Sequence, residues 1–172
     1  MSGVLVVLAG VPGTGKTTLA RALAAELRGA YLRVDAAETA LKAALPGVPF
    51  GAAGYAVVRA LAAESLALST HVVVDAVNPV PEARAGWRAL ARSNDSALVL
   101  LETYLPDVTE HEARVRARTP DLTGHIVPTW AEVAGWPYMP WDEGRDGPRH
   151  RIDMTDAVAG LREALDAVDS CS

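Results

Sequence analysis

Residues 10–17 read GVPGTGKT and satisfy the spacing G-x-x-x-x-G-K-[ST]. Glycines at these positions let backbone N–H groups turn inward around a phosphate, and a helix that begins here adds unpaired donors and partial positive charge. We therefore expect Lys16 to reach the terminal phosphates of a nucleoside triphosphate, ATP or GTP, and the Thr17 hydroxyl to ligate Mg²⁺. A chance glycine turn before a helix is the alternative. The expected nucleotide contacts are Gly10, Gly13, Thr14, Gly15, Lys16, Thr17 and Thr18.

Two carboxylates end predicted strands: Asp35 follows YLRV, and Asp75 follows HVVV. In open parallel sheets, ligands gather at the carboxyl ends of the strands. A carboxylate at this edge can hold Mg²⁺ through water or accept the proton of an attacking hydroxyl. Helix N-capping is the competing interpretation, especially for Asp35, which precedes a predicted helix. Asp153 ends a weaker strand, and we interpret it as the cap of the last helix.

Arg114 and Arg118 are four residues apart in a predicted helix, which places both on one face. Forked, permanently charged guanidinium groups suit the charge that is spread over phosphoryl oxygens. The alternative is a solvated helix face on which these arginines pair with Glu110 and Glu112.

Four of the nine aromatic residues fall within residues 130–141, in a segment rich in proline and glycine. Such rings could pack over a bound ring or base, or they could form the small core that keeps a long loop ordered. A second segment that could face a substrate is 46–55, whose glycines would allow closure over the site. The aromatic residues of the first segment are Trp130, Trp136, Tyr138 and Trp141.

The elements that must position these residues alternate between strand and helix. Apolar runs predict strands at 4–9, 30–35, 71–79, 97–105 and 150–154. Helical spacing predicts helices at 16–27, 38–69 with a break at 45–51, 80–92, a segment capped by Asp107 or Thr109, 129–134 and 156–168. This alternation indicates an α/β sandwich built on a parallel sheet.

Composition limits the classes of protein that this chain can be. With 172 residues, half of them hydrophobic, it is expected to form one domain with a buried core. The net charge of −5 argues against a protein that holds nucleic acid by its phosphates. No apolar run is long enough to cross a membrane, and the first residues read as a core strand rather than a signal peptide. A single cysteine, Cys171, suits the cytoplasm, and four scattered histidines do not form a transition-metal motif.

Four segments together resemble the small P-loop kinase group: GVPGTGKTTLARALA, YLRVDAAETAL, VVVDAVNPVPEARAGWRALA and HEARVRAR. That group contains chloramphenicol phosphotransferase, gluconate and adenylylsulfate kinases and the kinase domain of polynucleotide kinases, and its members are often labelled AAA family ATPases. The resemblance spans about residues 3–120 and continues more loosely to the end of the chain. It implies one P-loop kinase domain over residues 1–172, a nucleoside-kinase-like three-layer sandwich with a five-stranded parallel sheet and a small lid at roughly 107–148.

The resemblance also implies roles for individual residues. Asp35 matches the aspartate that activates the acceptor hydroxyl, and Arg114 and Arg118 match arginines that close over the phosphoryl group. Asp75 matches an acid near the metal and the substrate, so Mg²⁺ carried by the nucleotide is expected at Thr17 and Asp75. The expected catalytic residues are Lys16, Asp35, Arg114 and Arg118, and the expected acceptor contacts are Asp35, Asp75, Asn78, Tyr55 and Trp136.

One position departs from the group's pattern. Many relatives have arginine three residues after the first acid, whereas this chain has Glu38. An acceptor whose phosphate is gripped by that arginine, as in polynucleotide kinases, is therefore less expected. We interpret Glu38 as helix surface, with contact to a cationic or hydroxyl-bearing substrate as the alternative.

These observations favour an ATP-dependent phosphotransferase that acts on a hydroxyl of a small antibiotic-, sugar- or nucleoside-like molecule. The alternatives are an ATPase, a nucleotide-binding regulator without an acceptor, and a kinase of nucleotide or polynucleotide 5′-hydroxyls. A ring-forming AAA+ subunit would need a second helical domain, and a GTPase would need an N-K-x-D motif, which the sequence lacks. Neither the acceptor nor the oligomeric state can be read from the sequence.

Overall fold

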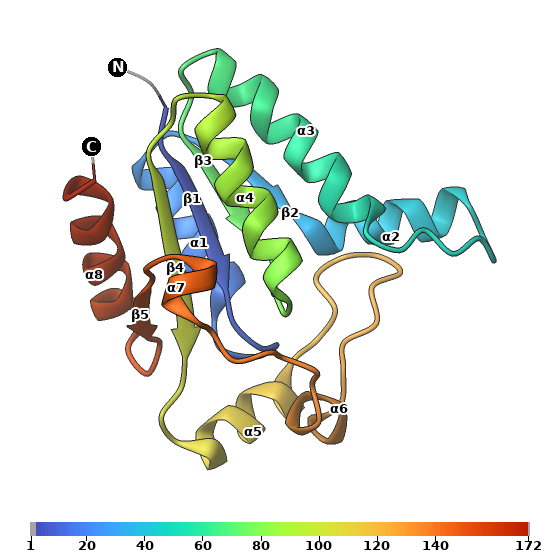
Figure 1. Ribbon diagram of the computed structural model, residues 1–172. Coiled ribbons are helices and arrows are strands. Elements are labelled where there is room, and N and C mark those ends of the chain that lie inside the picture. Colours follow the sequence, from blue (N-terminus) through green and yellow to red (C-terminus); the bar gives the residue numbers. More distant parts are fainter. Residues whose placement is uncertain (1–2, 172) are drawn as a thin grey trace.

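Five parallel strands form the centre of the molecule in the order β2-β3-β1-β4-β5 (Figure 1). The structure is a computed structural model that describes residues 3–171. Because every neighbouring pair is parallel, the carboxyl ends of all five strands lie at the same edge of the sheet. The strands are β1 (Leu5–Ala9), β2 (Ala30–Arg33), β3 (Val72–Asp75), β4 (Leu98–Tyr104) and β5 (His150–Asp153).

Helices cover both faces of this sheet, as the α/β prediction requires (Figure 1). Helices α1 and α8 pack on one face, and α3 and α4 pack on the other. Helices α2, α5 and α6 lie toward the carboxyl edge, whereas α7 lies beside α4 and in front of β4 in Figure 1. The helices are α1 (Lys16–Glu26), α2 (Val34–Ala44), α3 (Ala53–Ala67), α4 (Pro81–Ser93), α5 (Val108–Ala117), α6 (Trp130–Ala134), α7 (Glu143–Asp146) and α8 (Ala157–Asp169).

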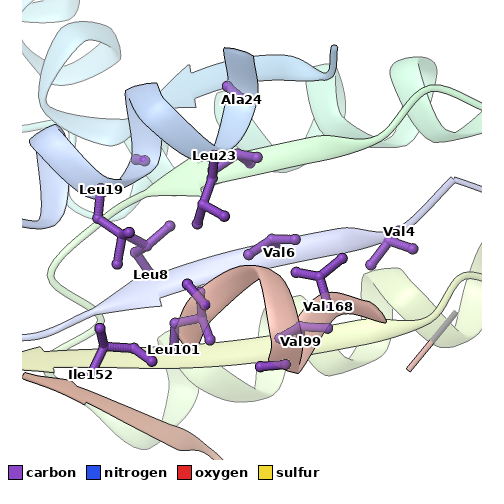
Figure 2. Close-up of a cluster of buried hydrophobic side chains, with 14 of the residues drawn as sticks. Val4, Val6, Leu8, Leu19, Leu23, Ala24, Val99, Leu101, Ile152 and Val168 are labelled. Carbon is purple, nitrogen blue, oxygen red and sulfur yellow. The ribbon is translucent and has the colours of Figure 1, made fainter. Parts of the chain in front are cut away.

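The core is divided by the sheet because side chains of a strand alternate between its two faces. From β1 and the residue before it, Val4, Val6 and Leu8 join the cluster under α1 and α8 (Figure 2). Leu5 and Val7 point to the opposite cluster, under α3 and α4. A strand buried on both faces must be apolar throughout, which explains the continuous apolar run in the sequence. Among the described residues, no helix has the length and apolar composition needed to span a bilayer.

Several predicted boundaries were wrong. Strand β2 ends at Arg33, and Asp35 lies in the first turn of α2 rather than at the end of a strand. The segment AAETALKAA has high helix propensity, and an acid is favourable in a first turn, so the helix begins earlier than expected. Arg118 is not in α5 but follows it with an extended backbone (φ −66°, ψ 133°). It therefore does not share a helix face with Arg114.

Three further findings concern individual helices, namely the caps of α5 and α8 and the presence of α7. The side chain of Asp107 caps α5 by accepting hydrogen bonds from two backbone N–H groups, which decides between the two expected caps. Asp156, not Asp153, caps α8; Asp153 instead accepts a hydrogen bond from the backbone of Thr155. The sequence analysis also missed α7, whose four residues are too few for a helical pattern to be visible.

Candidate functional site

The loop between β1 and α1 has the backbone that a phosphate cradle needs. Gly10, Gly13 and Gly15 all have positive φ angles, of 130°, 87° and 92°. A Cβ atom at Gly13 would lie 2.4 Å from Val115 Cγ2, so a larger residue would collide with α5. Gly15 precedes α1 without a side-chain cap, which leaves backbone N–H groups of the first turn available to an anion. Thr14 is buried, and its hydroxyl bonds to Val11 O at 2.9 Å, so we expect its nucleotide contact to come from the backbone.

Lys16 lies under this loop with only 8% of its surface exposed. Its Nζ donates a hydrogen bond to the backbone oxygen of Val11 at 2.8 Å, so the side chain is folded back along the loop. Burial lowers the pKa of Lys16 to about 8, although the nearby carboxylates of Asp75 and Asp35 act in the opposite direction. A phosphate bound in the cradle would supply the negative charge that this buried ammonium lacks.

Asp75 and Thr17 meet at the base of the loop. The Thr17 hydroxyl donates to Asp75 Oδ2 at 2.7 Å, and the Tyr31 hydroxyl donates to the same oxygen at 2.9 Å. Asp75 is only 4% exposed. Among the described residues there is no cluster of three or more His, Cys, Asp or Glu side chains that could hold a metal alone. One hydroxyl and one carboxylate fit Mg²⁺ that arrives with nucleotide phosphates and keeps several waters.

Asp35 lies beside a buried arginine that the sequence analysis did not single out. Arg33 Nη2 donates to Asp35 Oδ2 at 3.2 Å, and Arg33 Nη1 donates to Asp121 Oδ2 at 2.7 Å. Arg33 Nε lies 3.7 Å from Asp75 Oδ2, beyond hydrogen-bond distance. His125 Nε2 is 4.0 Å from Asp35 Oδ2. A third of the Asp35 side chain remains exposed, so it is open to a substrate.

The two arginines expected over the phosphates have different environments. Arg114 pairs with Glu110 and donates to the backbone oxygens of Met154 at 2.8 Å and Thr155 at 3.2 Å. The two backbone bonds attach α5 to the segment after β5. The pair with Glu110 is one of the helix-face pairs named in the alternative interpretation. Arg118 lies close enough to Lys16 for its charge to lower the pKa of that lysine.

A single cavity of about 900 Å³ joins the glycine loop to the first turns of α2. It brings together most of the residues selected from the sequence, which come from six separate parts of the chain. Residues expected to bind the nucleotide and residues expected to contact an acceptor therefore line the same space. The selected residues in its lining are Gly13, Gly15, Lys16, Thr17, Thr18, Asp35, Tyr55, Asp75, Arg114, Arg118 and Trp136.

Asn78 is absent from that lining, and its hydrogen bonds are used within the fold. Its Nδ2 donates to Leu8 O at 2.7 Å, and its Oδ1 accepts from Trp87 Nε1 at 2.7 Å. The residue is 1% exposed and has a positive φ of 52°. Its backbone N–H donates to the Tyr55 hydroxyl at 3.1 Å, which holds Tyr55 at the cavity wall. We therefore no longer assign Asn78 to the acceptor and interpret it as a support for Tyr55.

The four aromatic residues of segment 130–141 lie in different surroundings. Trp136 lines the cavity. Tyr138 and Trp141 instead pack on the guanidinium of Arg84, which lies 5.1 Å and 4.6 Å from their ring centroids. The Trp130 ring packs edge-on against the His111 ring, with 5.2 Å between the two ring centroids.

Arg84 is a fully buried residue that the sequence analysis missed. It pairs with Asp146 at 2.8 Å and donates to Met139 O at 2.6 Å and Asn78 O at 3.0 Å. These bonds fix the segment that follows Trp136 against α4. Spacing offered one signal, because Arg84 lies three and seven residues before the buried Trp87 and Ala91 on one face of α4.

Glu38 also differs from expectation, since it is half-buried in the cavity wall rather than on an exposed helix surface. Its side chain lies against Gly54 of α3, where a Cβ atom would be 2.4 Å from Glu38 Cγ. Burial raises the pKa of Glu38, and the neighbouring charge of Asp35 adds to this effect. Lys42, one turn further along α2, is the cation that acts against this rise.

Comparison with known proteins agrees with the sequence resemblance. A family model described as an AAA domain matches residues 5–128. No curated protein sequence matches the chain. A gluconokinase from Sinorhizobium meliloti 1021 is 23% identical, with a TM-score of 0.65 over 98% of this chain and 93% of its own.

Two further solved structures are similar. Kti12 from Chaetomium thermophilum, in complex with ADP-AlF3, is 19% identical, with a TM-score of 0.71 over 97% of this chain and 98% of its own. The APS kinase CysC from Mycobacterium tuberculosis, in complex with AMPPNP and APS, is 19% identical, with a TM-score of 0.63 over 98% and 96% of the two chains. These likenesses establish a P-loop kinase-like α/β fold and confirm the predicted five-stranded parallel sheet.

Proposed function

The chain belongs to this AAA domain family, and we propose that it is an ATP-dependent phosphotransferase that acts on a hydroxyl group of a small molecule. One observation carries the proposal. The cavity that contains the glycine loop and Lys16 also contains Asp35, a partly exposed carboxylate that belongs to α2 and not to the glycine loop. A mechanical or switch NTPase does not need an acceptor-side carboxylate and an adjoining space for a second ligand.

In the proposed reaction, the glycine loop and Lys16 hold the β- and γ-phosphates, and Thr17 and Asp75 would hold the Mg²⁺ that accompanies them. The metal would offset negative charge on the phosphates when it is bound. Asp35 accepts the proton of the acceptor hydroxyl while the hydroxyl oxygen bonds to the γ-phosphorus. The bond from that phosphorus to the bridging oxygen breaks, and ADP leaves. Arg118 and Lys16 stabilise the charge on the moving phosphoryl group.

Glu38 supports an acceptor that is neutral or positively charged. It takes the position at which many related kinases carry an arginine, and it lines the cavity three residues from Asp35. A phosphate on the acceptor would meet two carboxylates there, which makes nucleotide and polynucleotide ends poor candidates. A small polyol, sugar or amino alcohol fits the charge of this wall better.

The proposal is tested by measuring ATP consumption with and without a panel of antibiotics, sugars and nucleosides. Mass spectrometry should detect a product that is heavier than its acceptor by about 80 Da, one phosphoryl group. Rapid turnover that needs no acceptor, with no phosphorylated product, would instead support an ATPase.

Asp35→Asn is the matched variant for this assay. It should abolish transfer, since the amide cannot accept the proton, while ADP binding stays at the wild-type level. Calorimetry with ADP provides the binding control. Full transfer activity in Asp35→Asn would refute the role given to Asp35.

A further inference from the structure

Arg33 contacts carboxylates from three separate parts of the chain. Asp35 belongs to α2, Asp75 ends β3, and Asp121 lies in the loop between α5 and α6, residues 118–129. The guanidinium is buried, with 3% of the Arg33 side chain exposed. A buried cation is stable only when it is well paired, so these contacts determine where their partners lie.

The loop 118–129 forms part of the cavity wall. Arg118, His125, Ile126 and Pro128 line the cavity. Figure 1 shows this loop leaving α5, rising toward α2 and returning to α6. Ile126 is 83% exposed, and the ion pairs of Asp121 with Arg33 and Arg21 attach the loop to the body of the protein.

Asp121 has two arginine partners that differ in what else they touch. Arg33 is buried and also contacts Asp35, whereas Arg21 of α1 pairs with Asp121 at 2.9 Å and is half exposed. Exposed ion pairs contribute little, so the bond from Arg33 is the one expected to hold the loop. The hydrogen bond from Arg33 also lowers the pKa of Asp121, in keeping with a strong pair.

We propose that Arg33 is a positioning residue that fastens the loop 118–129 over the cavity and, through the same guanidinium, orients Asp35 toward the acceptor. Closure of the loop and placement of the proton acceptor are then coupled. When Asp121 leaves Arg33, Arg118 no longer stabilises the phosphoryl group in transfer, and Asp35 loses a neighbour that fixes its orientation. The effect on turnover rests on the proposed function, whereas the fastening of the loop can be tested without any acceptor.

The fastening is tested by limited trypsin digestion, with mass spectrometry following cleavage of the Arg118–Thr119 bond. Asp121→Asn and Arg33→Met should both increase the rate of this cleavage severalfold. Arg21→Met is the matched control, because it removes the other partner of Asp121 but does not touch Asp35, and it should change the rate little. Equal cleavage in wild type, Asp121→Asn and Arg33→Met would overturn the proposal. Asp121→Asn keeps the test decisive if Arg33→Met fails to fold, since Asp121 is 35% exposed.

The coupling is tested by kinetics once an acceptor is known. Asp121→Asn should lower kcat by about tenfold to a hundredfold, since small misplacements of reacting groups have effects of this size. The KM for ATP and the affinity for ADP should stay unchanged, which a general structural defect would not allow. Asp121→Asn should have no further effect in an Arg33→Met background, because the two residues act as one unit. Additive effects, or a change in ATP KM alone, would overturn the coupling.

Discussion

Lys16 is buried, and this determines how nucleotide binding depends on pH. In the free protein, burial lowers the pKa of Lys16 to about 8, so the side chain loses its proton above that pH. Bound phosphates favour the ammonium form and raise this pKa again. We therefore expect ADP binding, measured as the difference from Lys16→Met, to take up nearly one proton at about pH 9 and almost none at about pH 6.5.

The measurement is calorimetry of ADP binding in magnesium-free buffers that differ in ionisation enthalpy. The slope of the observed enthalpy against that ionisation enthalpy gives the number of protons taken up. Lys16→Met supplies the control, since its remaining binding should show no such uptake. A slope that is the same at both pH values would contradict the assignment.

Glu38 is the residue through which the charge of the acceptor can be tested. Gly54 leaves room for its side chain at the cavity wall, where its carboxylate can pair with an amine on the acceptor. Glu38→Gln should raise the KM for an amine-bearing acceptor by about tenfold, the usual effect of losing one charged hydrogen bond. The KM for a neutral acceptor should change much less.

Initial rates with paired amine and hydroxyl analogues of one acceptor give this comparison. Glu64→Gln is a suitable control because Glu64 is an exposed residue of α3. If Glu38→Gln weakened both analogues equally, Glu38 would be a packing residue and not a determinant of acceptor charge.

At the scale of elements, the short helix α7 depends on the ion pair between Asp146 and Arg84. Both side chains are almost completely buried, with exposures of 1% and 0%. Asp146→Asn leaves the Arg84 charge without its partner and should destabilise the fold by about 3 kcal/mol at neutral pH. Urea unfolding monitored by circular dichroism measures this difference.

The pH dependence of that difference has a definite sign. Hydrogen bonds from Arg145, from the Asp142 backbone and from Arg84 lower the pKa of Asp146 below its value in the unfolded chain. The carboxylate therefore stabilises the fold above the unfolded pKa of about 3.9, and this contribution is lost as the pH falls below it. Wild type and Asp146→Asn should thus converge in acid. Arg145→Gln is the control, since Arg145 is partly exposed and its loss should matter less.

Elements whose signal is local could be predicted from the sequence. The apolar runs gave the five strands, and the glycine spacing gave the loop before α1, because each depends on neighbouring residues only. Boundaries were less certain where two local preferences compete, as at Asp35, where helix propensity shortened β2. Helix α7 could not be predicted, since it is held by a side chain 62 residues away.

The same distinction applies to the candidate site. Lys16, Asp35 and Asp75 line the cavity, as positions that follow from the parallel sheet should, and the roles given to them stay predictions. Arg33 and Arg84 were missed, since an arginine in the sequence reads as surface until its distant carboxylates, Asp121 and Asp146, are known. Asn78 was expected among the acceptor contacts, but its side chain points into the fold. A motif does not reveal which way a side chain turns.

For the molecule as a whole, two buried arginines hold two separate walls of one cavity. Arg33 holds the loop 118–129, and Arg84 holds the segment after Trp136. The bonds of Arg84 are shielded from water, whereas Asp121 is about one-third exposed and can exchange its partner for solvent. The wall held by Arg84 is therefore expected to stay in place, whereas the wall formed by residues 118–129 is the one proposed to open.

This difference between the two walls has a consequence for the route by which ligands would reach the cavity. If the loop 118–129 opens as proposed, ligands would enter and leave past it, and Trp136 in the other wall would limit how deep an acceptor can lie. Two ligands that pass through the same opening would bind and leave in a fixed order, because the deeper ligand cannot leave before the one nearer the opening.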